Sequence, residues 1–106
     1  MTILARWSDP PLLVLASLAD GPKHGYAIVA DVSEMSGVRL GPGTLYGALA
    51  RLEDEGLIES LPAAGRRRPY KLTSTGAAAL EGRLQTMASV AQQGLTRLRA
   101  QAGTAR

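Results

Sequence analysis

The stretch Gly41-Pro42-Gly43-Thr44-Leu45-Tyr46-Gly47-Ala48-Leu49-Ala50-Arg51-Leu52-Glu53-Asp54-Glu55-Gly56-Leu57-Ile58 contains the start, both faces and the end of one helix. Pro42 suits the first helical position, where a missing N–H costs nothing. Gly56 suits the left-handed residue that ends a helix. Between them, apolar residues recur at helical spacing and predict one buried face. These residues are Leu45, Ala48, Leu49 and Leu52.

The other face of this helix carries mostly small side chains. Its members are Gly43, Thr44, Tyr46, Gly47, Ala50 and Arg51. A helix that only faces water usually carries many Lys and Glu residues, so this face is suited to close approach. The free N–H groups at the helix start could hold a phosphate while the helix enters the major groove of DNA. We therefore expect this face to bind DNA.

Two side chains on this face have alternative roles. Tyr46 follows the core-facing Leu45 and lies off the buried stripe, so its ring and hydroxyl favour contact with a phosphate or a thymine methyl over packing. Arg51 could reach a phosphate, or it could pair with Glu55 one helical turn later. An exposed pair of that kind contributes only about 0.3 kcal/mol.

Length and composition indicate one folded domain with an appended element. The chain has 106 residues, of which 45% are hydrophobic, and it contains no cysteine and one histidine. These features argue against disulfides, thiol chemistry and a metal site, and we expect no cofactor. No apolar run reaches the about 20 residues that span a bilayer, and the start lacks the pattern of a signal peptide. We therefore expect a cytoplasmic protein with no membrane partner.

Charge is distributed unevenly along the chain, although the net charge is only +3. An acidic block at residues 53–59 precedes a basic cluster made of Arg66, Arg67, Arg68 and Lys71. Such a cluster can simply keep a turn in water, but at a hairpin tip the arginines are placed to contact a DNA backbone or minor groove. Lys23 and His24 are candidates for further phosphate contacts, and His24 could instead cap a helix.

The residues before the opening stretch predict two further helices. Ser8 or Asp9 can cap a helix that begins at Pro10 and Pro11 and is buried to Leu18. A second helix follows Gly25 and ends at Gly37. Its expected apolar stripe consists of Tyr26, Ile28, Val29, Val32 and Met35. Residues 38–40 suit a short strand or a connector.

The residues after it predict a hairpin and a long helix. Residues 57–61 and 68–72 suit two strands around a turn rich in Pro, Gly and small residues. Thr73 can cap a helix that runs from about Ser74 to about Arg99, and residues 101–106 suit a frayed tail. In that helix Leu80, Leu84, Met87, Ala91, Gly94 and Leu98 recur at steps of four and three, which is typical of helix pairing.

This order predicts a mainly α (α+β) fold, a winged helix-turn-helix with a two-stranded wing and a long C-terminal dimerisation helix. Residues 1–73 would form the DNA-binding domain with its leader, and residues 74–106 the dimerisation helix and tail. A monomer would leave the apolar stripe of the last helix exposed, which favours a homodimer over a helix that folds back on its own domain. The dimerisation residues would be Leu80, Leu84, Met87, Ala91, Leu95 and Leu98.

The chain resembles the PadR family of transcriptional regulators, in its short form with a single C-terminal helix. The matching segments are Leu13-Val14-Leu15-Ala16-Ser17-Leu18, Gly21-Pro22, His24-Gly25-Tyr26-Ala27-Ile28, Pro42-Gly43-Thr44-Leu45-Tyr46, Leu49, Arg51-Leu52-Glu53, Gly56-Leu57-Ile58, Tyr70, Leu72-Thr73 and Gly76. The chain departs from the family at Gly41, where relatives often carry a serine cap, a change that costs only a few tenths of a kcal/mol.

The resemblance implies a homodimeric repressor that binds an inverted-repeat operator, with Tyr26, Thr44 and Tyr46 near DNA. It also implies a small aromatic or hydrophobic effector near the dimer interface, although the last helix has no Trp or Phe to stack on a flat drug. Trp7 could line such a pocket, or it could be a packing anchor.

Two other classes of function fit the sequence less well. An enzyme is disfavoured, because Gly41-Pro42-Gly43 lacks the Gly-Lys-Ser/Thr ending of a phosphate loop and no catalytic set is present. A winged helix that binds another protein remains the alternative, since a fold does not determine its function.

Overall fold

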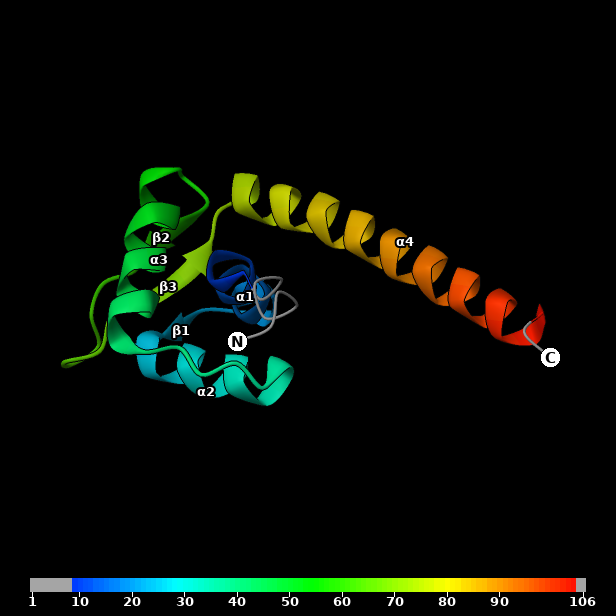
Figure 1. Ribbon diagram of the computed structural model, residues 1–106. Coiled ribbons are helices and arrows are strands. Elements are labelled where there is room, and N and C mark those ends of the chain that lie inside the picture. Colours follow the sequence, from blue (N-terminus) through cyan, green and yellow to red (C-terminus); the bar gives the residue numbers. More distant parts are fainter. Residues whose placement is uncertain (1–8, 105–106) are drawn as a thin grey trace.

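The computed structural model describes residues 9–104, which form a compact unit and one projecting helix (Figure 1). The elements in chain order are α1 (Pro10–Ser17), a 3₁₀ turn (Leu18–Asp20), β1 (Lys23–His24), α2 (Gly25–Ser36), α3 (Pro42–Asp54), β2 (Ile58–Ser60), β3 (Pro69–Leu72) and α4 (Ser74–Thr104). The predicted winged helix-turn-helix with a long C-terminal helix is confirmed.

Local signals begin and end the first helices as the sequence predicts. Asp9 caps α1 by accepting the Leu12 N–H at 3.5 Å, and proline occupies the first helical position. His24 caps α2 through its side chain, and Gly37 ends that helix at φ 76°. Residues 38–40 form a connector and not a strand.

The core lies where α1, α2 and α3 meet beneath the sheet. The predicted inner face of α3 is buried as expected, and Gly56 follows the helix at φ 75°. The buried apolar residues are Val14, Leu15, Leu18, Ile28, Val32, Leu40, Leu45, Ala48, Leu49, Leu52, Ile58 and Leu80. Helix α1 packs against the inner face of α3. The outer face of α3 is therefore left exposed to solvent.

The buried face of α2 is narrower than the apolar stripe that the sequence predicts. Ile28 and Val32, one helical turn apart, are fully buried, whereas Tyr26 is 79% exposed and Met35 is also exposed. A helix that packs on one side can bury only a narrow stripe, and Ile28 and Val32 occupy it. Tyr26 is therefore released to the surface.

The sheet has three antiparallel strands in the order β1-β3-β2. The hairpin of β2 and β3 is the predicted wing, with Ile58 opposite Leu72 and Ser60 opposite Tyr70. Strand β1 was not predicted, because two residues are too short to show an alternating pattern. Its pairing of His24 with Pro69 brings the start of α2 beside the wing.

Helix α4 is fixed to the compact unit at its first turn. Thr73 accepts the Gly76 N–H at 3.0 Å and donates its hydroxyl to the Gly56 carbonyl at 2.6 Å. Gly76 lies against Leu57 so closely that a Cβ would come within 1.8 Å of the Leu57 carbonyl oxygen. The start of α4 is thereby joined to the end of α3.

The helix then projects away from the unit, and the molecule measures 62 × 30 × 20 Å (Figure 1). Its 31 residues correspond to about 46 Å at the usual rise per residue. It continues to Thr104, so the expected end near Arg99 and the frayed tail from residue 101 are wrong over the described residues. Within residues 9–104, no helix combines the length and apolar character that crossing a membrane requires.

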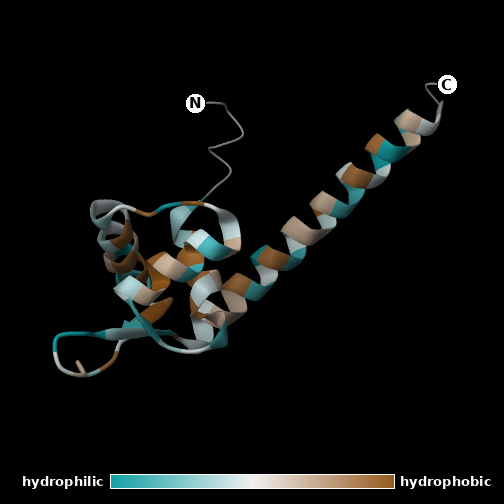
Figure 2. Ribbon diagram, turned by 90° about the horizontal axis from the view of Figure 1, so that it is seen from below, coloured by the Kyte–Doolittle hydropathy of each residue, from teal (hydrophilic) through white to brown (hydrophobic). Residues whose placement is uncertain are grey.

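Apolar and polar residues alternate along the projecting part of α4 (Figure 2). Leu80 is one of the expected dimerisation residues, but it is only 4% exposed and belongs to the core of its own chain. The remaining predicted residues are exposed: Leu84, Met87, Ala91, Leu95 and Leu98. Val90 is an exposed apolar residue outside the predicted set.

Candidate nucleic-acid interface

A groove of about 400 Å³ lies between the start of α2, the outer face of α3 and the wing. Six of the predicted site residues line it, although they come from three separate parts of the chain. They are His24, Tyr26, Tyr46, Arg66, Arg67 and Arg68. The fold therefore brings the basic cluster and the two tyrosines to one surface.

Backbone hydrogen bonds close the turn at the wing tip, and a side-chain contact joins the tip to the start of α2. Gly65 turns the chain at φ 67°, and Ala64 and Arg67 exchange backbone hydrogen bonds across the turn. Arg67 Nη1 lies 3.4 Å from His24 Nε2. Within residues 9–104 none of the three arginines has a carboxylate partner, whereas Lys71 pairs with Glu59 at 3.3 Å. The positive charge at the tip is therefore not neutralised by the described chain.

Two phenol rings lie at the same groove. Tyr46 is 56% exposed and extends from α3 over the first residue of α2. A methyl group at Gly25 would lie 3.1 Å from the Tyr46 hydroxyl, so glycine leaves room for this ring. Tyr26, in the first turn of α2, is the more exposed of the two.

The outer face of α3 is open as the sequence predicts. Its small residues Gly43, Thr44, Gly47 and Ala50 are all exposed, and no side chain caps its first turn. Arg51 forms an exposed ion pair with Glu55 at 3.4 Å, which is the second of its two expected roles. The N–H groups at the start of α3 thus face solvent beside an uncrowded surface.

Lys23 differs from its expected role. Its ammonium donates to the Ser17 carbonyl and to Asp20, and it lies 3.9 Å from Asp31. Its side chain is only 19% exposed, so the charge is directed into its own domain and away from the groove. Hydrogen bonding and the charge of Lys23 lower the pKa of Asp20 below its ordinary value.

Sequence reasoning missed three residues near the interface. Gly25 and Tyr70 line the groove, and Arg39 lines a neighbouring hollow of about 370 Å³ beside Tyr26. Tyr70 lies two residues before Leu72, so the alternation of side chains along a strand puts both on the same face of the sheet. Arg39 gave no signal beyond its position before the buried Leu40.

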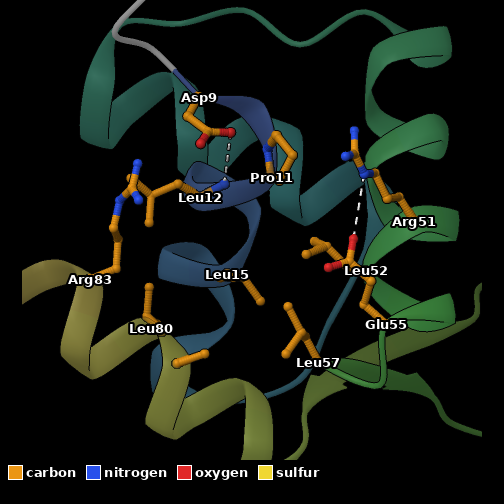
Figure 3. Close-up of a pocket in the computed structure, with 11 residues that line it drawn as sticks. Asp9, Pro11, Leu12, Leu15, Arg51, Leu52, Glu55, Leu57, Leu80 and Arg83 are labelled. Atoms are coloured by element: carbon orange, nitrogen blue, oxygen red, sulfur yellow. Dashed lines mark hydrogen bonds and ion pairs between the residues drawn. The ribbon is translucent and has the colours of Figure 1, made fainter.

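A second pocket, of about 430 Å³, lies between α1, α3 and α4 on another side of the molecule (Figure 3). Leucines from these helices and from the turn after α3 form its wall: Leu12, Leu15, Leu52, Leu57 and Leu80. Asp9, Arg51, Glu55 and Arg83 add charged groups to its lining. Trp7, the residue expected to line an effector pocket, lies outside the described residues.

Side chains that bind metals do not gather anywhere in the described chain. Over residues 9–104 there is no group of three or more His, Cys, Asp or Glu residues suited to a metal ion. The groove is instead lined by cationic and phenolic side chains, which are groups of the kind that contact phosphates in DNA-binding proteins.

Comparisons with known proteins agree with this geometry. Residues 14–82 match the family described as "Transcriptional regulator PadR-like family". A transcriptional regulator of Mycobacterium tuberculosis, Rv3488, is 43% identical over 72 residues, which cover 65% of this chain and 66% of the relative. A crystal structure of a PadR family transcription regulator from Clostridium difficile has a TM-score of 0.75 and 30% identity, covering 84% of this chain and 97% of that chain.

Another relative is much longer than this chain. An uncharacterized 37.1 kDa protein in a transposon of Streptomyces fradiae is 54% identical over 83 residues, which cover 78% of this chain. The match spans only 24% of that relative.

Proposed function

The chain belongs to the PadR-like family of transcriptional regulators, and we propose that it is a repressor that binds an inverted-repeat operator in double-stranded DNA as a homodimer. As a member of this family it is a regulator and not an enzyme. The observation that supports operator binding best is the groove where the three arginines lie beside Tyr46 of α3 without a carboxylate partner among residues 9–104.

The two parts of this surface have complementary chemistry. The small residues of α3 allow a helix backbone to approach base edges in a major groove, and Tyr46 adds a hydroxyl and a flat apolar ring. The arginines of the wing supply sequence-independent attraction to phosphates. Phosphate contacts from the wing would set the register in which α3 meets the bases.

The projecting helix supports a homodimer. Leu84, Met87, Ala91, Leu95 and Leu98 are exposed along a helix that extends beyond the compact unit. A second copy of the same helix would cover this stripe with equivalent residues, as an isologous interface requires. Two recognition helices in such a pair would read half-sites about one DNA turn, or a multiple of it, apart.

Selection of bound duplexes from a random pool tests this proposal directly. We expect an inverted repeat with two half-sites and binding that weakens steeply with salt. A pool without enrichment, together with a complex that forms with another protein and is insensitive to salt, would instead support the alternative of a protein-binding winged helix.

Release of the operator by a small aromatic or hydrophobic effector forms part of this proposal. The pocket in Figure 3 supports it, because a volume of about 430 Å³ and a leucine-rich wall suit a small apolar molecule. Residues of both α3 and α4 line the pocket, so a bound molecule would contact the proposed recognition helix and the proposed dimerisation helix together. Loss of operator binding in the presence of such a compound would test this role. Ala79→Leu enlarges an exposed side chain in the pocket lining, so this variant should respond less to the compound.

A further inference from the structure

The two ring nitrogens of His24 each face a hydrogen-bond donor. Nδ1 lies 3.3 Å from the Ala27 backbone nitrogen, and Nε2 lies 3.4 Å from Arg67 Nη1. A neutral imidazole has one accepting nitrogen and one N–H, and a guanidinium can only donate. Only one of these two contacts can therefore be a hydrogen bond.

The contact with Ala27 is the one that the fold holds in place. The Ala27 N–H belongs to the first turn of α2, where it has no partner within the helix, and His24 is the capping residue. Arg67 is on the exposed wing tip and can donate to water instead. Nδ1 is therefore the acceptor, and Nε2 carries the proton.

This assignment leaves two donors side by side. The Nε2–H of His24 and the guanidinium of Arg67 lie side by side in the groove, and neither donates to an acceptor among residues 9–104. Arg66 and Arg68 line the same groove, and none of its lining residues is a carboxylate. Adjacent donors in a basic groove call for an anion that accepts two hydrogen bonds at once, and a phosphate does so with its non-bridging oxygens.

We propose that His24 and Arg67 together bind one phosphate group of the DNA backbone, which we call the shared phosphate. This inference rests on the proposed function, because it names a contact by which the same surface would hold DNA. The shared phosphate links the first turn of α2 to the wing, since His24 caps that helix with one nitrogen and binds the phosphate with the other.

The protonation of His24 provides the first test. His24 is the only histidine of the chain, so its imidazole nitrogens give unambiguous signals in a ¹⁵N NMR spectrum. In the full chain without DNA, we expect the neutral ring to carry its proton on Nε2. A proton on Nδ1 would mean that Arg67 already donates to Nε2, and the shared phosphate would be ruled out.

A double-mutant cycle provides the second test. His24→Asn keeps a capping side chain but is too short to reach the phosphate, so α2 should stay capped. Arg67→Ala removes the other donor. A mixed-sequence duplex of about 30 base pairs serves as the probe, because it is long enough for both DNA-binding domains of a dimer and a phosphate contact does not depend on sequence.

Each single change should weaken binding by about tenfold, as loss of a hydrogen bond to a charged group does. If the two residues share one phosphate, the double variant should bind more tightly than the product of the single losses predicts, by a factor of about three or more. Losses that multiply without coupling would refute the proposal. Thermal unfolding of His24→Asn checks that the capped fold is kept.

Controls separate this inference from the proposed function. Arg97→Ala removes the same charge from α4, far from the groove, and should leave affinity within about twofold. If the wild-type chain binds the duplex and His24→Asn binds equally tightly, the shared phosphate is wrong and operator binding stands. If the wild-type chain binds no duplex even at low salt, both fail. A shift of the Nε2 signal with inorganic phosphate alone, without an effect of His24→Asn on DNA affinity, would identify a free-phosphate site and overturn the DNA contact.

Discussion

Tyr46 of α3 rests over Gly25, the first residue of α2, and a methyl group at Gly25 would lie 3.1 Å from the Tyr46 hydroxyl and 3.3 Å from Leu45 Cδ2. The distance from the hydroxyl is shorter than most van der Waals contacts, so a side chain at Gly25 would push the ring outward. The position of this phenol therefore depends on a glycine on a neighbouring helix. Gly25 therefore belongs to the proposed interface, although it has no side chain that could contact DNA.

Gly25→Ala should weaken DNA binding by about three- to tenfold while lowering the free energy of unfolding by only about 1 kcal/mol. The exposed end of Tyr46 can move, whereas the buried Leu45 has little room. Fluorescence anisotropy with the selected operator and thermal unfolding would measure the two effects. Gly47→Ala, on the open outer face with nothing near its Cβ, shows the effect of a methyl group that meets no side chain. Unchanged affinity for Gly25→Ala would mean that the position of Tyr46 does not matter.

Arg66→Ala combined with Arg68→Ala should flatten the salt dependence of DNA binding. Each phosphate contact contributes about 0.9 to the slope of log K against log salt, so a homodimer that loses both contacts in each subunit should lose about 3.6. Titrations at several salt concentrations give the slope. A slope equal to that of the wild-type chain would show that the wing tip does not contact DNA. Arg97→Ala again provides the control for the loss of positive charge.

Gly76→Ala should destabilise the fold by about 3 kcal/mol or more. The added methyl group would come within 1.8 Å of the Leu57 carbonyl oxygen, and a backbone atom cannot move aside as a side-chain end can. Chemical denaturation measures the loss. Gly82→Ala is the matched control on α4, because nothing lies near its Cβ and alanine favours a helix by about 1 kcal/mol. Equal stability of the two variants would contradict the contact.

Leu84→Glu combined with Leu98→Glu should separate the proposed homodimer. Leu98 is 69% exposed, and charges introduced along the stripe would repel their copies on the second chain. We expect the dissociation constant of the dimer to rise by at least about 100-fold, as loss of two apolar side chains per chain implies. Sedimentation measures the change. Gln92→Glu adds charge outside the predicted stripe and should leave the dimer intact, and a wild-type chain that is monomeric at micromolar concentration would exclude pairing altogether.

Asp20→Asn should reduce stability at neutral pH but not in strong acid. Hydrogen bonding to Lys23 and the charge of Lys23 hold the pKa of Asp20 below its ordinary value of 3.8. Its ionised form therefore stabilises the folded state above about pH 4, and this contribution disappears as the pH falls through the lowered pKa. Denaturation of both chains across this range should give unfolding free energies that converge on acidification. Asp54→Asn removes a carboxylate without an ion-pair partner among residues 9–104 and should show no such convergence.

The helix that carries the proposed contacts could be predicted because its signals are contiguous. Pro42, the buried stripe and Gly56 lie within a single segment, and each acts through local geometry. The wing could be predicted for the same reason, since its turn residues separate two short apolar runs. Caps such as Asp9 and Thr73 also act within a few residues of their position.

Features that depend on distant residues could not be predicted. Strand β1 exists because β3 offers it a free edge, and its two residues show no pattern of their own. The direction of Lys23 is set by acceptors in the first helix, the 3₁₀ turn and α2. Leu80 fits the heptad spacing of a paired helix, yet the contact of α4 with α1 buries it within its own chain. The contact between His24 and Arg67 likewise joins residues that are far apart in sequence.

The joint at Thr73 has a geometric consequence for any pair of these molecules. Its hydroxyl donates to the Gly56 carbonyl and accepts the Gly76 N–H. These two hydrogen bonds restrict sliding and rotation of α4 relative to α3. If a second copy packs against α4, the angle around the helix axis at which it packs then determines the direction in which its own α3 points. Successive residues of a helix are rotated by about 100° around its axis. The number of α4 residues between Thr73 and the contact with the second copy therefore sets this angle. In the proposed homodimer, the half-site spacing that two copies of α3 can reach would therefore depend on the angle around the α4 axis at which the helices pair, as well as on affinity.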